Sequence, residues 1–180
     1  MNVIFDLDGV ILDSQAAIVE AYRLAGVDAP KDILARESER WCTGMSADEF
    51  TTVKRAKDHV YAAKIQQGEV PLLSGWRAAE VVARQHDVHL MTGAAFSAVD
   101  ALYTRMHPAW PFTAVVAKVT QREKFARIAL FTPCVYIDDQ PIADGLARVD
   151  VRVVCYHGQA WEKLARDITD VVSLLKAEGL

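Results

Sequence analysis

The chain has 180 residues, of which 52% are hydrophobic and 24% charged, and its net charge at pH 7 is −4. These values fit a globular protein with one domain and, at most, a small appended lobe. The acidic balance argues against nucleic-acid binding through bulk electrostatics. No apolar run approaches the ~20 residues of a membrane span. Asp6 and Asp8 interrupt the first apolar segment, which therefore does not fit a signal peptide.

Cysteine usage indicates the compartment. The chain has an odd number of cysteines and no CxxC pair; they are Cys42, Cys134 and Cys155. Reduced, buried thiols in a cytosolic protein show this pattern. We therefore expect a cytoplasmic protein. We also expect either a monomer or a homodimer.

The first predicted strand, residues 3–5, ends in the carboxylates Asp6 and Asp8, and Gly9 follows. Turn residues, rather than a pair of acids, normally stop a buried strand. Side chains two apart on an extended backbone point the same way, so Asp6 and Asp8 are expected to share one small space. Two like charges at that separation repel, and a divalent cation is the usual neutralising partner. The sequence therefore predicts chemistry at the end of this strand.

The segment from residue 14 to residue 70 contains no predicted strand. A first helix is expected to end near Gly26. Ser46 and Glu49 then form a capping box, in which each side chain satisfies a backbone amide of the other residue. The box opens a long helix, on which apolar residues at helical spacing predict one buried face. They are Phe50, Val53, Ala56, Val60 and Ala63. We expect a small helical lobe here.

The rest of the chain alternates strands and helices. Further strands are predicted at residues 88–91, 114–116, 135–137 and 151–155. Helices are predicted around residues 76–83, 125–129 and 161–175. Alternation of this kind favours an α/β fold, a three-layer Rossmann-like parallel sheet of five core strands with a small α-helical cap inserted after the first strand. Residues 1–13 and 71–180 would form the core, and residues 14–70 the cap.

Polar residues follow two of these strands. Thr92 and Gly93 end the second strand, and Asp138 and Asp139 end the fourth. The carboxyl ends of parallel strands meet at the edge where such sheets bind ligands. Thr92 alone is also explained as a helix N-cap, and the aspartate pair alone as a turn. Taken together with Asp6, they favour a functional site.

Residues 6–14, Asp-Leu-Asp-Gly-Val-Ile-Leu-Asp-Ser, resemble the first motif of the haloacid dehalogenase superfamily, in its branch of phosphoglycolate phosphatases and β-phosphoglucomutase-like proteins with a small helical cap. Residues 89–93 and 135–139 resemble its second and fourth motifs. The third motif is one lysine, either Lys124 or Lys118, and we favour Lys124 because it opens a helix. One departure is Ala143, where the family usually has Asp or Asn; Asp144 lies one residue further on.

The resemblance implies a role for each matched residue. Asp6 would be the nucleophile that forms an aspartyl-phosphate, and Asp8 the general acid and base. The substrate phosphate would be bound by Thr92, Gly93 and Lys124. Mg²⁺ is the implied cofactor, because an all-oxygen site suits a hard cation. Its ligands would be Asp6, Asp8, Asp138 and Asp139.

The implied function is a Mg²⁺-dependent phosphatase that hydrolyses a small phosphomonoester, a metabolite or a nucleotide. Asp8 supports this class, because dehalogenases of the superfamily lack the second aspartate and its ion-pumping ATPases carry Thr there. Three alternatives remain: a β-phosphoglucomutase-type phosphomutase, a polynucleotide end-phosphatase, and a non-catalytic family member that binds a ligand.

Overall fold

The computed structural model describes residues 1–35, 44–140 and 150–180. Cys42, Ala143 and Asp144 lie outside these ranges. The chain divides into two compact units, residues 1–12, 72–94 and 109–180, and residues 13–71 and 95–108. We describe each unit by itself.

The first unit contains a five-stranded parallel sheet in the order β3-β2-β1-β4-β5. All five strands were predicted from the sequence. They are β1 (Asn2–Phe5), β2 (Asp87–Met91), β3 (Ala114–Val116), β4 (Cys134–Asp138) and β5 (Val151–Cys155). β1 lies at the centre of the sheet, between β2 and β4. Its carboxyl end is therefore flanked by the carboxyl ends of two other strands.

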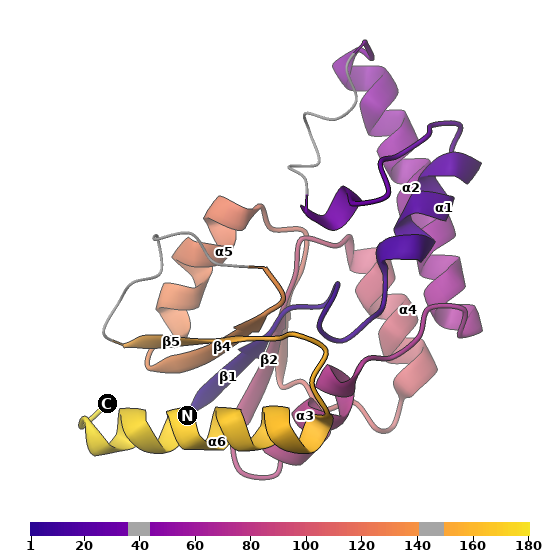
Figure 1. Ribbon diagram of the computed structural model, residues 1–180. Helices are drawn as coiled ribbons and strands as arrows, with labels where there is room; N and C mark the ends of the chain where they lie inside the picture. The colour runs from indigo at the N-terminus through magenta and orange to yellow at the C-terminus, as the bar shows by residue number, and fades with distance from the viewer. Residues whose placement is uncertain (36–43, 141–149) are drawn as a thin grey trace. The chain divides into compact units, whose positions relative to one another are not determined.

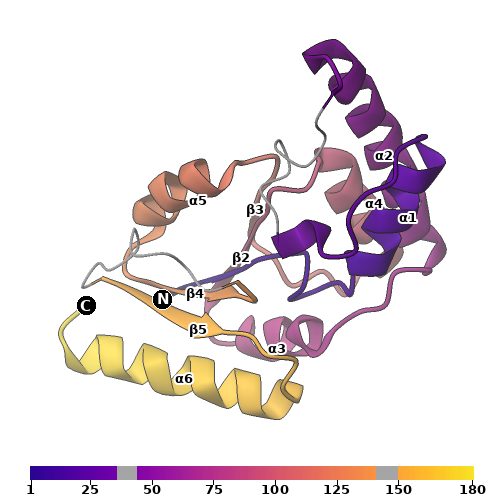
Figure 2. The same ribbon diagram turned by 45° about the horizontal axis from the view of Figure 1, so that its top comes forward.

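Helices cover both faces of this sheet, as Figures 1 and 2 show. α3 (Ser74–Val82) and α6 (Trp161–Ala177) lie on one face, and α5 (Gln121–Ile128) with the short η2 (Ala129–Phe131) lies on the other. Because both faces are covered, β1 and β4 are buried along most of their length and are almost continuously apolar. This is the predicted three-layer Rossmann-like α/β fold.

Alternation along the strands sends successive side chains to opposite faces of the sheet. Ile4 and Tyr136 join the core with Ile128 of α5. Phe5 points to the opposite face, where its ring contacts that of Phe112. Residues two positions after Ile4 and Tyr136 are Asp6 and Asp138, so both carboxylates belong to the face that α5 covers.

The second unit is helical. It contains α1 (Gln15–Leu24), η1 (Ile33–Ala35), α2 (Ala47–Gln67) and α4 (Phe96–Met106). α2 packs against both α1 and α4. Arg105 of α4 donates from Nη1 to the carbonyl of Val70, at 2.7 Å, and more weakly to that of Ile65, at 3.5 Å. These contacts satisfy carbonyl groups at and just beyond the end of α2.

Three sequence predictions for this unit can be compared with the structure. The capping box is confirmed: Ser46 Oγ accepts from the Glu49 amide, and Glu49 accepts from the Ser46 amide. Of the predicted apolar face of α2, only Ala56 is exposed and the other four side chains are half-buried, while the buried side chains of the helix, Tyr61 and Ile65, were not predicted. α4 was not predicted as a helix. Residues 95–108 group with the helical unit, whereas the sequence division assigns them to the core.

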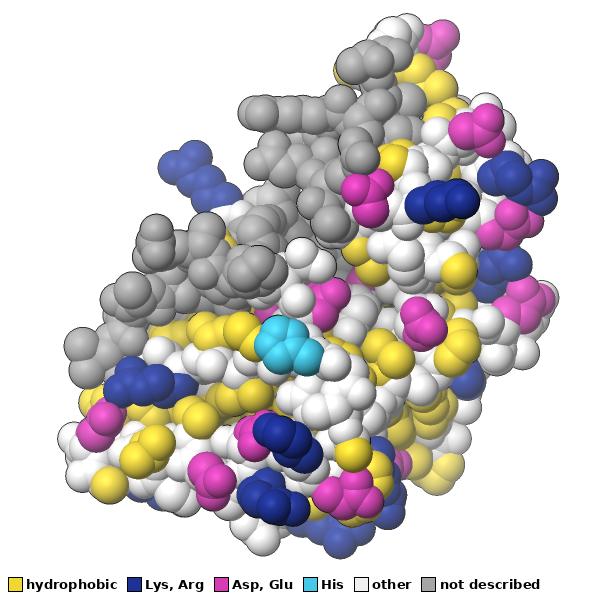
Figure 3. All heavy atoms as spheres, viewed as in Figure 1, with side chains coloured by type: hydrophobic (Ala, Val, Ile, Leu, Met, Phe, Trp, Pro, Cys, Tyr) yellow, Lys and Arg dark blue, Asp and Glu magenta, His cyan; other side chains and the backbone are white. Residues whose placement is uncertain are grey.

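Side chains of both charges are interspersed over α6 on the face that Figure 3 shows. Within the described ranges, no helix is long and apolar enough to cross a membrane.

Candidate active site

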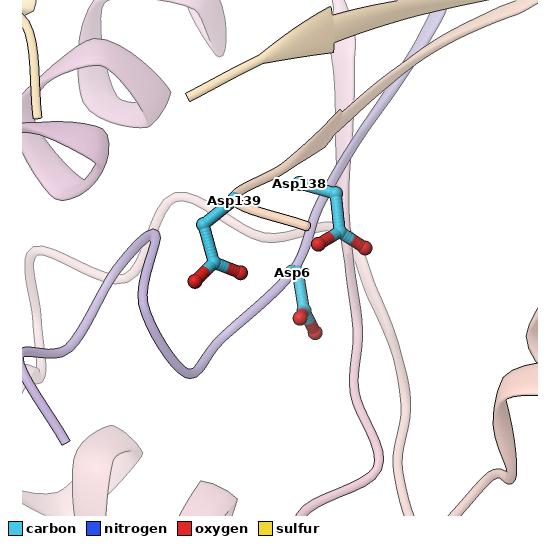
Figure 4. Close-up of side chains that lie close together, drawn as sticks. All are labelled: Asp6, Asp138 and Asp139. Carbon is cyan, nitrogen blue, oxygen red and sulfur yellow. The ribbon is translucent and has the colours of Figure 1, made fainter. Parts of the chain in front are cut away.

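The ends of β1 and β4 bring three carboxyl groups together. β1 and β4 pair in register, Ile4 opposite Tyr136, and the pairing continues where the Asp6 amide donates to the Ile137 carbonyl at 2.9 Å. One oxygen from each of Asp6, Asp138 and Asp139 lies within 4.8 Å of the others. Figure 4 shows the three carboxyl groups around one small space. The sequence predicted this convergence.

Lys124 reaches the same space from α5. Its Nζ lies 2.8 Å from Asp6 Oδ1, and both side chains are buried. The contact is close enough for a strong ion pair. Lys124 lies in the first turn of α5, where Thr120 and Glu123 form a capping box.

Tyr136 links Lys124 to Asp138. Its hydroxyl donates to Asp138 Oδ2 at 2.5 Å and accepts from Lys124 Nζ at 3.4 Å. The other oxygen of Asp138, Oδ1, accepts from the backbone amide of Gln140 at 2.9 Å. The Gln140 side chain donates to Asp139 Oδ2 at 3.1 Å. Both carboxylates after β4 are therefore oriented by neighbouring donors.

Burial raises the pKa of Asp6 to about 7. Lys124 opposes this shift, and the negative charges of Asp138 and Asp8 add to it. Burial also raises the pKa of Asp139, helped by the charge of Asp138. Several carboxylates thus share one ammonium in a low-dielectric site, which favours binding of a proton or another cation.

The same carboxylates also raise the pKa values of Lys124 and Tyr136. Burial opposes the charge of Lys124, but Asp6 and Asp138 outweigh it and raise its pKa, so this ammonium keeps its charge. Burial, with the neighbouring carboxylates, also raises the pKa of Tyr136. Its hydroxyl therefore remains protonated and able to donate.

Asp8 lies in a tight turn that follows β1. Leu7, Ile11 and Leu12 are completely buried, and the amides of Ile11 and Leu12 both donate to the Leu7 carbonyl. Asp8 is only half-buried and forms a bridge with Leu12. The apolar turn thus anchors a partly exposed carboxylate beside the buried one at Asp6.

Thr92 and Gly93 follow β2, the other neighbour of β1. The Thr92 amide donates to the Val116 carbonyl, and Thr92 Oγ1 accepts from the Ala94 amide at 3.0 Å. Since α4 begins only at Phe96, with Ala95 as its N-cap, the explanation of Thr92 as a helix N-cap is wrong. A Cβ on Gly93 would lie 3.3 Å from the Val119 carbonyl, so this loop runs close to the end of β3.

The structure separates the two candidate lysines. Lys124 is 5% exposed and paired with Asp6. Lys118 is exposed, in a left-handed conformation with φ 58°, and its backbone amide donates to the Ala94 carbonyl. Of the two lysines, Lys124 is thus the one that lies beside Asp6, and its role in binding phosphate stays a prediction.

The donor set fits a hard divalent cation. It consists of carboxylate oxygens, the buried carboxylates are opposed by one ammonium, and the local charge is negative. Sequence reasoning missed two residues that shape this set, Tyr136 and Gln140. Tyr136 had a detectable signal, because a residue two positions before a strand-end aspartate shares its face.

The fold is α/β, with a cluster of carboxylates at the carboxyl edge of a parallel sheet. No family model matches the sequence, and no curated protein matches it. Among solved structures it is similar to a protein described as a haloacid dehalogenase-like hydrolase from Bacteroides fragilis, at 16% identity and a TM-score of 0.67, covering 90% of this chain and 92% of that one.

Two further solved structures are also similar to this chain. A protein described as a phosphoglycolate phosphatase from Lactobacillus delbrueckii is 15% identical, with a TM-score of 0.62 over 93% of this chain and 97% of that one. CbbY from Rhodobacter sphaeroides, solved in complex with phosphate, is 18% identical, with a TM-score of 0.57 over 88% and 87%. At these identities the likeness establishes the shared fold.

Proposed function

We propose that this protein is a metal-dependent phosphatase that hydrolyses a small phosphomonoester through an aspartyl-phosphate on Asp6. The observation that carries the proposal is the Asp6–Lys124 ion pair beside Asp138 and Asp139 at the carboxyl edge of the sheet. A buried carboxylate with an ammonium at 2.8 Å provides both a nucleophile and a binding group for a phosphoryl oxygen.

In the first half of the reaction an Asp6 oxygen attacks phosphorus, and the bond from phosphorus to the leaving oxygen breaks. Asp8, partly exposed on its turn, gives its proton to that oxygen. In the second half Asp8 takes a proton from water, the hydroxide attacks phosphorus, and the Asp6 carboxylate is released with inorganic phosphate. Thr92 Oγ1, the Gly93 amide and Lys124 Nζ hold the other phosphoryl oxygens.

Asp6, Asp138, Asp139 and the backbone carbonyl of Asp8 would hold Mg²⁺, which when bound offsets the repulsion between the carboxylates and the anionic phosphate. A small, sugar-like substrate is favoured, because the structurally similar CbbY was solved with xylulose-1,5-bisphosphate in a variant with Asp replaced by Asn. The helical unit would act as the cap that selects substrate, and a cytoplasmic location would give access to such metabolites.

The experiment is a screen of phosphorylated metabolites and p-nitrophenyl phosphate, with and without Mg²⁺, that measures inorganic phosphate. The wild-type protein should release phosphate only with a divalent ion, and Asp6→Asn should release none while its circular dichroism spectrum is unchanged. Wild-type turnover by Asp6→Asn would refute the nucleophile. Isomerised product without phosphate release would instead identify a phosphomutase.

A further inference from the structure

Tyr136 lies in the buried strand β4 and is completely inaccessible to solvent. Its side chain belongs to the layer that α5 covers, among apolar residues such as Ile4 and Met91. A hydroxyl in that environment costs free energy unless it is hydrogen-bonded. The partners of this hydroxyl are charged groups of the candidate active site.

Both hydrogen-bonding capacities of the Tyr136 hydroxyl are used. Its single proton is donated to Asp138 Oδ2 at 2.5 Å, and its oxygen accepts from Lys124 Nζ at 3.4 Å. The hydroxyl therefore stands between an ammonium and a carboxylate that attract each other. Lys124 Nζ instead makes its short contact, 2.8 Å, with Asp6 Oδ1.

Resting on the function proposed above, we propose that Tyr136 is a positioning residue: its hydroxyl separates Lys124 from Asp138. This separation directs the ammonium to Asp6 and the phosphoryl group, and it leaves the Asp138 carboxylate for the metal ion. Tyr136 touches neither the substrate nor the metal ion, and acts through the two residues that do.

Removal of the hydroxyl has a specific consequence. In Tyr136→Phe, Asp138 loses a donor at a place where it is only 1% exposed. A buried carboxylate without its partner is costly, and Lys124 is the nearest cation on a flexible stem. Lys124 then pairs directly with Asp138, competes there with Mg²⁺, and moves away from Asp6.

The test measures the Kd of Mg²⁺ alone by isothermal titration calorimetry, with the full-length chain. Tyr156→Phe is the matched control, because Tyr156 is also buried in the first unit and its hydroxyl bonds to Ser74 Oγ at 2.8 Å rather than to a carboxylate. Loss of a group that orients a metal ligand weakens metal binding by about tenfold or more. We expect that weakening in Tyr136→Phe, and a change below about twofold in Tyr156→Phe. A smaller loss in Tyr136→Phe, or an equal loss in both variants, would overturn the proposal.

A double-mutant cycle tests the cause. If Lys124 is the competitor, the loss of Mg²⁺ affinity caused by Tyr136→Phe should be smaller in the Lys124→Met background than in the wild-type background. An undiminished effect in the Lys124→Met background would overturn the competition. These readouts need no turnover: a wild-type protein that hydrolyses no phosphomonoester would refute the proposed function, while the Mg²⁺ comparison still decides the role of Tyr136.

If Tyr136→Phe does not fold, the wild-type protein answers the question by NMR with tyrosine labelled at ¹³Cζ. The Tyr136 signal should show slow hydroxyl exchange and should shift when Mg²⁺ is added, whereas the Tyr156 signal should not shift. A Tyr136 signal that Mg²⁺ leaves unchanged would overturn the coupling between this hydroxyl and the metal ligand.

Discussion

Gly9 and Asp139 approach each other so closely that a Cβ at position 9 would lie 2.2 Å from Asp139 Oδ2. Gly9 also has φ +83°, a backbone conformation that L-residues with side chains rarely adopt. The turn after β1 and the end of β4 are thus fitted together at a glycine. This fit determines how near the third carboxylate comes to the other two.

Gly9→Ala should therefore be damaging in two ways. The left-handed conformation should cost about 1–2 kcal/mol in the free energy of unfolding, and the new methyl group should displace Asp139 and weaken Mg²⁺ binding. Gly26→Ala is the control, because Gly26 has φ +89° and nothing within 4 Å of the added Cβ. Urea denaturation and Mg²⁺ titration measure both effects. Equal losses of stability in the two variants, with unchanged Mg²⁺ affinity in Gly9→Ala, would contradict the close fit.

Lys124 and Lys118 offer a matched pair of substitutions. Lys124→Met removes the ammonium beside Asp6, and should lower kcat/KM for a phosphomonoester by about 10²–10³-fold. Lys118→Met removes an exposed side chain, and should change kcat/KM by less than about threefold. Steady-state kinetics on both variants shows which of the two lysines binds the phosphate. A larger loss in Lys118→Met would reverse the assignment of the phosphate-binding lysine.

The affinity for Mg²⁺ should depend on pH. Burial raises the pKa of Asp6 to about 7, so in the metal-free protein a proton competes with the cation below that pH. Affinity should fall by up to about tenfold per pH unit below pH 7, as titrations between pH 5.5 and 8 would show. Asp6→Asn should flatten this dependence; an affinity that is constant with pH in the wild-type protein would contradict the shift.

The stability of the metal-free protein should fall as the pH rises, whereas the affinity for Mg²⁺ should rise. Because the pKa of Asp6 is raised on folding, from an ordinary 3.8 to about 7, the folded state binds the proton more tightly. Its contribution to stability is fully present below the unfolded pKa, and is lost as the pH rises through 7. Denaturation in excess chelator should show this loss, and saturating Mg²⁺ should reduce it. Asp6→Asn should remove this component.

Arg105 should stabilise the helical unit without acting on the candidate site. Its side chain donates to the carbonyls of Val70 and Ile65, so Arg105→Ala should lower the free energy of unfolding by about 1–2 kcal/mol. Hydrogen exchange should rise at the end of α2 and in α4, while Mg²⁺ affinity stays unchanged. Arg55→Ala, on an exposed part of α2, is the control and should change stability by less than about 0.5 kcal/mol. Faster hydrogen exchange in the sheet of Arg105→Ala would contradict an effect that is limited to the helical unit.

The strands could be predicted because a sheet covered on both faces requires short apolar runs, as in residues 3–5 and 135–137. The position of the candidate site residues could be predicted because polar side chains such as Asp6 and Thr92 interrupt those runs where they end, and their roles stay predictions. The same logic missed Tyr136. Its ring satisfies the apolar pattern of β4, and only its place two residues before Asp138 indicates that its hydroxyl reaches the site.

The helical unit was harder to predict because its packing depends on non-local contacts. Apolar spacing on α2 selects Phe50 and Val53 as readily as Tyr61 and Ile65, and the choice follows from where α1 and α4 lie. α4 carries a helical signal that was missed, because its buried residues Ala98, Val99, Ala101 and Leu102 stand at helical spacing. Arg105 connects α4 to the end of α2 through backbone carbonyls, which no sequence pattern reveals.

The central place of β1 has a consequence for the order of assembly. β1 comes first in the chain, yet its two neighbours, β2 and β4, come from residues 87–91 and 134–138. Closing such long loops costs entropy before any pairing repays it, so these contacts form late. A nascent chain that has not reached Asp138 holds Asp6 without the carboxylates that share its cation. The carboxylate cluster of the protein is therefore complete only after β4 has joined the sheet.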